Sequence, residues 1–154
     1  MKLVTVAEMR AIEKEADERG ISYRQMMETA GLGLAEVIQS LNVFEEPPKV
    51  MALVGPGNNG GDALVALSAL ARIGWGVEAY LVRPRPAEDS LASQLAQLGG
   101  KVTSLADDPG FDHLGDALAS AKILIDGVLG TGIQLPLKDE VARALAFVRN
   151  FEPL

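Results

Sequence analysis

The sequence contains no cysteine and only one histidine, and these two absences exclude several kinds of site. Without cysteine the 154-residue chain has no disulfide framework, no thiolate metal site and no thiol nucleophile. With His113 as its only histidine, it cannot build a zinc site from several imidazole ligands. We expect His113 to be an ordinary residue of a surface helix rather than a catalytic group.

Basic residues and long apolar runs are also scarce. The 14 basic residues are outnumbered by 21 acidic ones, giving a formal net charge of −7. Such a chain lacks the electrostatic footprint of a protein that binds nucleic acid or acidic membranes. No uncharged apolar run approaches the roughly 20 residues of a membrane span, and no signal-peptide pattern is visible. The sequence therefore predicts a cytoplasmic protein without nucleic-acid or membrane partners.

The first 46 residues have the pattern of two helices, each beginning with a capping box. Thr5 with Glu8, and Ser22 with Gln25, have the spacing at which a side chain and a backbone amide cap each other. Apolar residues then recur at helical spacing opposite a charged face. Gly20, at the end of the first pattern, is suited to a left-handed helix stop.

Gly31 and Gly33 lie inside the second predicted helix, where each glycine costs about 1 kcal/mol relative to alanine. Two interpretations are open. The first, which we favour, is tight packing against a neighbouring helix, and the second is the close approach of a ligand or partner.

After Pro47 and Pro48, apolar strands alternate with helices. We predict strands over 49–54, 76–82, 101–105 and 122–126, and helices over 63–71, 88–98, 111–120 and 138–150. The first strand is almost wholly apolar, which is typical of a strand buried on both faces of a parallel sheet. The alternation predicts an α/β fold in one domain, with right-handed crossovers and helices on both faces of the sheet.

Ligands of open α/β sheets bind at the carboxyl ends of the strands, and two loops are expected there. The first, 55–62, carries the pattern G-x-G-x-x-G and places asparagines and an aspartate among backbone amides. The second follows Asp126, which ends an apolar strand, and contains Gly130-Thr131-Gly132. Asp126, an asparagine oxygen and backbone carbonyls form an all-oxygen set that suits a hard cation. Asp126 is also a candidate general acid or base, and its structural alternative is a cap of the strand end.

The glycine pattern alone is weak. No lysine follows it, which argues against a Walker loop. The acid that holds the ribose in dinucleotide folds is missing from the end of the next strand, where Arg83 and Arg85 stand instead. These arginines meet either a 2′-phosphate or solvent. An NADP-dependent dehydrogenase is therefore one alternative, although no proton-relay pattern accompanies it.

Three segments resemble the NAD(P)H-hydrate epimerase family, also called the YjeF N-terminal domain: QMMETAG at 25–31, GPGNNGGD at 55–62 and DGVLGTG at 126–132. The resemblance implies a Rossmann-like three-layer α/β/α sandwich with a mostly parallel sheet and two extra N-terminal helices. It implies an isomerase that interconverts the R and S forms of hydrated NADH and NADPH.

The resemblance also assigns residues and partners. It implies a potassium ion held by Asn59 and Asp126, and a homodimer. It further implies, in some members, a fused or separate dehydratase. The implied substrate contacts are Asn58, Asn59, Gly60, Gly61, Asp62, Gly130, Thr131, Gly132, Ile133, Gln134, Leu135 and Pro136.

The sequence departs from the family at two places. Ala63 stands where the family usually has glycine, and the chain ends at Leu154, before the family's next strand, aspartate and proline-serine-glycine turn. We therefore expect residues 1–154 to form a single domain without its C-terminal strands, in which Asp126 is the best-placed catalytic carboxylate. The alternative within this family is a non-catalytic binding or scaffold domain, as in RNA-decapping assembly factors.

Overall fold

The computed structural model describes residues 3–41, 46–130, 137 and 139–151 and contains one four-stranded sheet within them. The strands β1 (Val50–Val54), β2 (Val77–Leu81), β3 (Lys101–Ser104) and β4 (Ile123–Gly127) lie in the order β3-β2-β1-β4. All neighbouring pairs are parallel. The predicted parallel sheet is confirmed.

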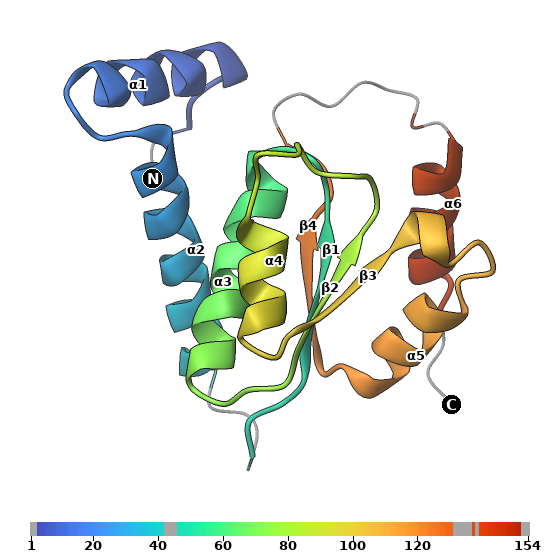
Figure 1. Cartoon of the computed structure of the whole chain (residues 1–154). Coiled ribbons are helices and arrows are strands. Elements are labelled where there is room, and N and C mark those ends of the chain that lie inside the picture. The colour runs from blue at the N-terminus through green and yellow to red at the C-terminus, as the bar shows by residue number, and fades with distance from the viewer. Residues whose placement is uncertain (1–2, 42–45, 131–136, 138, 152–154) are drawn as a thin grey trace.

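Helices cover both faces of this sheet (Figure 1). On one face lie α2 (Tyr23–Ser40), α3 (Asn58–Arg72) and α4 (Leu91–Gln97); on the other lie α5 (Asp112–Ser120) and α6 (Asp139–Arg149). A short 3-10 helix, η1 (Leu105–Asp107), follows β3, and α1 (Val6–Glu18) lies across the end of α2. The arrangement is the three-layer sandwich that the alternating pattern predicts.

The central strand β1 explains why its sequence is continuously apolar. Val50, Ala52 and Val54 belong to the apolar cluster under α2, α3 and α4. Met51 and Leu53 belong to the cluster under α5 and α6. Every side chain of β1 is at most 2% exposed, so neither face of this strand tolerates a polar residue.

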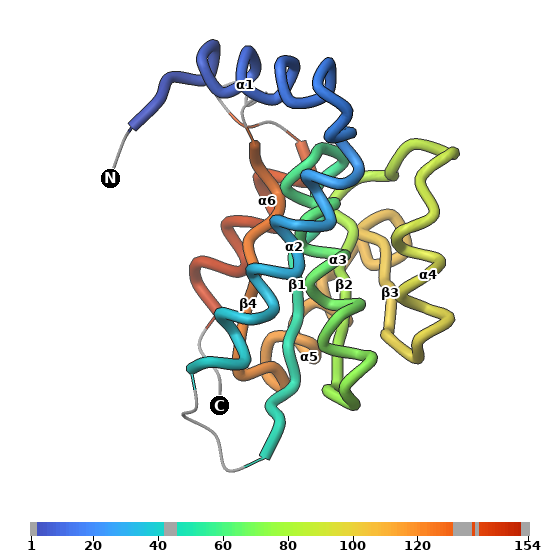
Figure 2. Tube along the Cα trace, turned by 90° about the vertical axis from the view of Figure 1, so that its left-hand side faces the viewer, coloured from blue at the N-terminus to red at the C-terminus, as the bar shows by residue number. Residues whose placement is uncertain are grey.

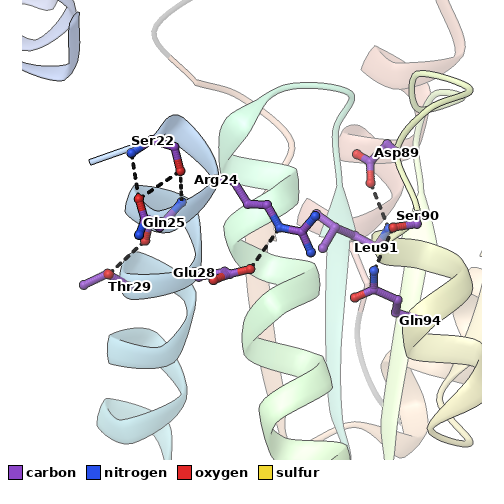
Figure 3. A network of polar contacts seen from close by, with 9 residues as sticks. All are labelled: Ser22, Arg24, Gln25, Glu28, Thr29, Asp89, Ser90, Leu91 and Gln94. Atoms are coloured by element: carbon purple, nitrogen blue, oxygen red, sulfur yellow. Dashed lines mark hydrogen bonds and ion pairs between the residues drawn. The ribbon is translucent and has the colours of Figure 1, made fainter. Parts of the chain in front are cut away.

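Both predicted capping boxes are present. The Thr5 side chain accepts the Glu8 amide while the Glu8 carboxylate accepts the Thr5 amide, and Ser22 and Gln25 repeat the arrangement (Figure 3). Gly20 has a φ of 94°, which confirms the left-handed stop after α1. The two N-terminal helices are therefore bounded by local interactions that the sequence makes visible.

Two helix starts differ from the prediction. α3 begins at Asn58 rather than near Ala63, so the asparagines and glycines of the first loop form its first turn. α4 begins at Leu91 rather than Glu88, with Ser90 as its N-cap, and the Asp89 carboxylate just before it accepts the Leu91 amide at 2.9 Å. Both differences arise from residues that favour turns as readily as helix starts.

Two carboxylates are buried outside the loops. Glu78 is fully buried, and its oxygens lie 2.7 Å from Lys49 Nζ and 3.1 Å from Lys101 Nζ. Burial favours a raised pKa for Asp108, but two backbone amides of α5 and the Tyr80 hydroxyl donate to its carboxylate and hold its pKa below the ordinary value. Burial, followed by the bond to Asp108, raises the pKa of Tyr80. These groups join β2 to its neighbours.

No helix of the described residues has both the length and the apolar character needed to cross a lipid bilayer.

The glycines of α2 have different surroundings. A Cβ added at Gly31 would lie 2.5 Å from Val65 Cβ and 2.7 Å from the Asp62 carbonyl oxygen, both on α3. A Cβ added at Gly33 would meet nothing within 4 Å. The packing interpretation is therefore confirmed for Gly31, whereas Gly33 touches no neighbouring helix.

We predict that Gly31→Ala lowers the free energy of unfolding by about 1–3 kcal/mol, because the added methyl group overpacks the α2–α3 contact. Gly33→Ala is the matched control, and we expect it to raise stability by up to about 1 kcal/mol through helix propensity. Urea denaturation of both variants measures the difference. Equal midpoints for Gly31→Ala and the wild type would contradict this account of the packing.

Candidate functional site

The two predicted loops meet at one edge of the sheet. β1 and β4 are adjacent, and the register aligns Val54 with Gly127 at their carboxyl ends. The Gly55 amide donates to the Gly127 carbonyl at 3.1 Å. Asn59 Nδ2, on the first turn of α3, donates to the Leu129 carbonyl at 2.6 Å, joining residues 70 positions apart. The structure therefore brings the two turns together.

Close backbone approach explains the glycines at this junction. A Cβ on Gly55 would collide with the Val128 carbonyl. A Cβ on Gly127 would lie 2.9 Å from the Asn59 carbonyl oxygen and 3.1 Å from the Leu53 carbonyl oxygen. Any larger residue at either position would separate the loops.

The first turn of α3 leaves its backbone donors open. Its N-cap, Gly57, has no side chain to cap the helix, and the first helical bond runs from the Gly61 amide to the Gly57 carbonyl at 3.2 Å. Among the described residues, the amides of Asn58, Asn59 and Gly60 have no hydrogen-bond acceptor. Free amides at a helix N-terminus, together with the helix dipole, attract anionic oxygens such as those of a phosphate.

Asp62 lies partly buried in the same helix turn. Burial raises the pKa of its carboxyl, and the negative charge of Glu13 on α1 adds to the effect. Figures 1 and 2 both place α1 at the end of the molecule where the strands end. The carboxyl of Asp62 therefore holds its proton to a higher pH than a solvated aspartate does.

Asp126 lies in β4, one residue before the strand ends at Gly127. It is exposed, and its Oδ1 accepts the Val128 amide at 3.0 Å, so the strand-end cap foreseen as its structural alternative is present. No hydrogen bond to Oδ2 is present among the described residues. Because Asp126 is aligned with Leu53, its side chain lies on the sheet face that α5 and α6 cover.

Asn59 and Asp126 carry oxygens of the type that a hard cation prefers. Asn59 donates through Nδ2, so its Oδ1 is turned to accept, and a Cβ on Gly130 would lie 3.6 Å from that oxygen. One amide oxygen and one carboxylate oxygen are the donor types that such ions prefer. The described residues contain no cluster of three or more aspartates, glutamates or histidines, so a transition-metal centre has no support there.

The sequence left two roles open for Arg85, contact with a 2′-phosphate or exposure to solvent. The structure places its side chain in neither surrounding. Its side chain is only 7% exposed and forms an ion pair with Asp89 at 2.5 Å. Its Nη1 donates to the carbonyls of Gly55 at 2.5 Å and Gly57 at 3.2 Å. It therefore meets the back of the glycine-rich turn rather than a 2′-phosphate or solvent. Arg83 is exposed, and its Nη2 lies 3.7 Å from the Asp139 carboxylate.

Of the other candidates, Gly130 lies beside Asn59. The remaining candidates of the second loop fall outside the described residues: Thr131, Gly132, Ile133, Gln134, Leu135 and Pro136.

Met27 of α2, which the sequence left unassigned, packs under the turn, since a Cβ on Gly61 would meet its thioether. His113 is exposed, as expected, and Trp75 packs against the cluster under α2, α3 and α4.

The parallel sheet, its two helical layers and the paired turns at its carboxyl edge define a Rossmann-like α/β domain. Residues 23–152 match the family described as "YjeF-related protein N-terminus", and the chain belongs to this family. This confirms the resemblance carried by the three sequence segments.

Curated relatives agree with this assignment. The chain is 33% identical over 150 residues to an NAD(P)H-hydrate epimerase of Cenarchaeum symbiosum, covering 97% of this chain and 68% of that protein. It is 32% identical over 145 residues to a bifunctional NAD(P)H-hydrate repair enzyme Nnr of Thermofilum pendens, covering 90% of this chain but 27% of that protein. The match therefore spans about a quarter of the bifunctional relative.

A solved structure supports the fold. The crystal structure of yeast ynu0 has a TM-score of 0.80 with this chain at 24% identity, and the match covers 99% of this chain and 68% of the yeast chain.

Proposed function

We propose that this chain is an NAD(P)H-hydrate epimerase, either alone or as the epimerase part of a larger repair enzyme. The observation that carries the proposal is the junction of two glycine-rich turns through the Asn59–Leu129 hydrogen bond, beside the uncapped start of α3. The first turn of α3 offers amides for a diphosphate, and the adjacent strand β4 carries Asp126 as a carboxylate for proton transfer. The functions for which the two curated relatives are named are consistent with it.

The reaction follows from the chemistry of a hydrated nicotinamide. The substrate carries a hydroxyl group on C6 of the reduced ring, next to the ring nitrogen. A proton donated to this hydroxyl lets it leave as water, while the nitrogen lone pair forms a C=N bond and leaves an iminium cation. Water adds to either face of C6 and returns a proton to the acid, which inverts the centre or restores it.

We assign these steps to the residues at the edge. The open amides of α3 bind the diphosphate, with Asn58, Gly60, Gly61 and Asp62 in contact with the nucleotide. Gly130 and the segment 131–136 contact it from the second loop. Asp126 donates and recovers the proton, and its carboxylate stabilises the iminium cation.

We predict that the full-length protein interconverts the R and S epimers of NADPH hydrate. Asp126→Asn lowers this rate by about 10²–10⁴-fold, because the amide cannot carry the proton. Chromatography of the two epimers over time measures the rate. The control is Asp116→Asn, an exposed aspartate of α5, which keeps full activity.

Three results would speak against the proposal. Undiminished epimerisation by Asp126→Asn would remove Asp126 as the proton carrier. Binding of the hydrates without turnover by the wild type would favour the non-catalytic binding domain, and hydride transfer from NADPH to a second substrate would favour the dehydrogenase.

We also propose that Asn59 and Asp126 hold a potassium ion. Asn59 Oδ1 and Asp126 Oδ2 accept no hydrogen bond among the described residues, and they belong to the two chain segments that the Asn59–Leu129 hydrogen bond joins. A bound ion would supply positive charge beside the anionic substrate and screen the Asp126 carboxylate. Further oxygens from solvent or substrate would complete its shell, since two donors are too few for an alkali ion.

We predict that KCl raises the melting temperature of the wild type above its value in tetramethylammonium chloride of equal ionic strength, because an ion that binds only the folded state stabilises it. Asn59→Ala abolishes this difference. Asn150→Ala, at the exposed end of α6, keeps it. Identical melting curves of the wild type in both salts would rule out the ion site.

We further propose that the protein is a homodimer in the cytoplasm, with α1 at the contact. No residue of α1 is buried, although Val6, Met9 and Ile12 form an apolar stripe along it. Their exposed fractions are 46%, 38% and 51%, and Leu3 beside them is 86% exposed. A second copy of the chain would remove this stripe from water. The dehydratase partner stays a prediction from the family resemblance.

We predict that Ile12→Asp converts the dimer to a monomer, because the charge would have to be buried in the contact. Ile73→Asp is the control, since Ile73 is equally exposed, at 53%, but follows the far end of α3. Light scattering after size-exclusion chromatography gives the mass of each variant. A monomeric wild type would contradict the proposal.

A further inference from the structure

We propose that Arg85 is a positioning residue that sets the orientation of the glycine-rich turn, so that the amides at the start of α3 face the ligand. This inference rests on the proposed nucleotide function of that turn. Arg85 acts from behind the turn and touches no ligand. Arg85 lies outside the three segments, 25–31, 55–62 and 126–132, that carry the family resemblance.

The guanidinium group is held from two sides. Toward the turn, Nη1 donates to the Gly55 and Gly57 carbonyls at 2.5 and 3.2 Å. Away from the turn, Nε and Nη2 contact Asp89 Oδ2 at 2.7 and 2.5 Å. Asp89 Oδ1 accepts the Leu91 amide at the start of α4 (Figure 3). Arg85 therefore ties the turn to α4 through a fork that only a planar guanidinium can form.

The carbonyl contacts determine where the amides point. In a trans peptide, the C=O and N–H groups lie on opposite sides. Arg85 donates to the Gly57 carbonyl from the side of the turn that faces α4. The Asn58 amide of the same peptide therefore points to the opposite side, where the ligand is proposed to bind. The Gly57 carbonyl also accepts the Gly61 amide and so starts α3. One cation thereby fixes both the start of the helix and the direction of its first open donor.

Burial and charge argue that this is the role of Arg85. The side chains of Arg85 and Asp89 are 7% and 14% exposed, so the positive charge is already neutralised and shielded from a phosphate. A Cβ on Gly60 would collide with the Gly55 carbonyl oxygen and would lie 2.7 Å from Arg85 Nη1. Glycine at position 60 therefore leaves space for this carbonyl and for the guanidinium that donates to it.

The test is Arg85→Lys in the full-length protein, with Arg72→Lys, at the exposed far end of α3, as the matched control. Lysine keeps the charge but cannot bridge both carbonyls and Asp89. We expect KM for NADPH hydrate to rise about tenfold, with a smaller change in kcat, because the loss falls on binding. Hydrogen exchange of the Gly61 amide, which donates to the Gly57 carbonyl, accelerates by about tenfold when measured without ligand. Arg72→Lys changes neither quantity.

Asp89→Asn is the second variant, for the case that Arg85→Lys does not fold. It keeps the arginine but weakens its anchor, so it shifts exchange and KM in the same direction by smaller factors. Unchanged KM and unchanged exchange of the Gly61 amide in either folded variant would overturn the proposal. If the wild type itself neither binds nor epimerises the hydrates, the proposed function fails, and the exchange data still decide whether Arg85 orders the turn.

Discussion

The parallel pairing of β1 with β4 is the constraint on which the rest of the site depends. It aligns Val54 with Gly127, and the Gly55–Gly127 hydrogen bond continues the pairing past the strand ends. Each intervening strand would separate the two turns by about 4.8 Å. With β4 on the other side of β2, Asn59 would no longer reach the Leu129 carbonyl. The order β3-β2-β1-β4 therefore creates the candidate site before any side chain contributes to it.

Glycine has three different roles around this junction. Gly20 supplies a positive φ at the end of α1. Gly31 lets α2 approach α3, and through Met27 this contact reaches the back of the turn at Gly61. Gly55 and Gly127 let two backbones approach within van der Waals distance of each other. The first role follows from the local pattern, and the packing role of Gly31 is expected without its partner, because naming α3 or the opposing backbone requires knowledge of which segment lies opposite.

The same distinction explains how much of the structure the sequence predicts. Strands, capping boxes and the alternation of β and α depend on neighbours a few residues away, and these predictions are confirmed. The start of α3 is missed because asparagine and glycine favour turns and helix N-termini alike. The location of Arg85 is missed because its partners, Gly55 and Gly57, lie 30 and 28 positions away. Proximity of Asn59 to the second loop is anticipated only through the rule that strand ends share an edge.

Electrostatics connects the acidic composition to the arrangement of this edge. With a formal net charge of −7 the protein as a whole does not attract a nucleotide, and at the edge Asp126 and Asp62 add negative charge of their own. The one buried arginine at the turn is neutralised by Asp89. Under the proposed function, the open amides and dipole of α3 are the groups that would attract a diphosphate among the described residues. Burial and Glu13 raise the pKa of Asp62, which reduces its repulsion of a phosphate as the pH falls. A cation beside Asp126 would reduce the repulsion between this second carboxylate and a phosphate. The proposed ion and the uncapped helix would therefore both offset negative charge at this edge.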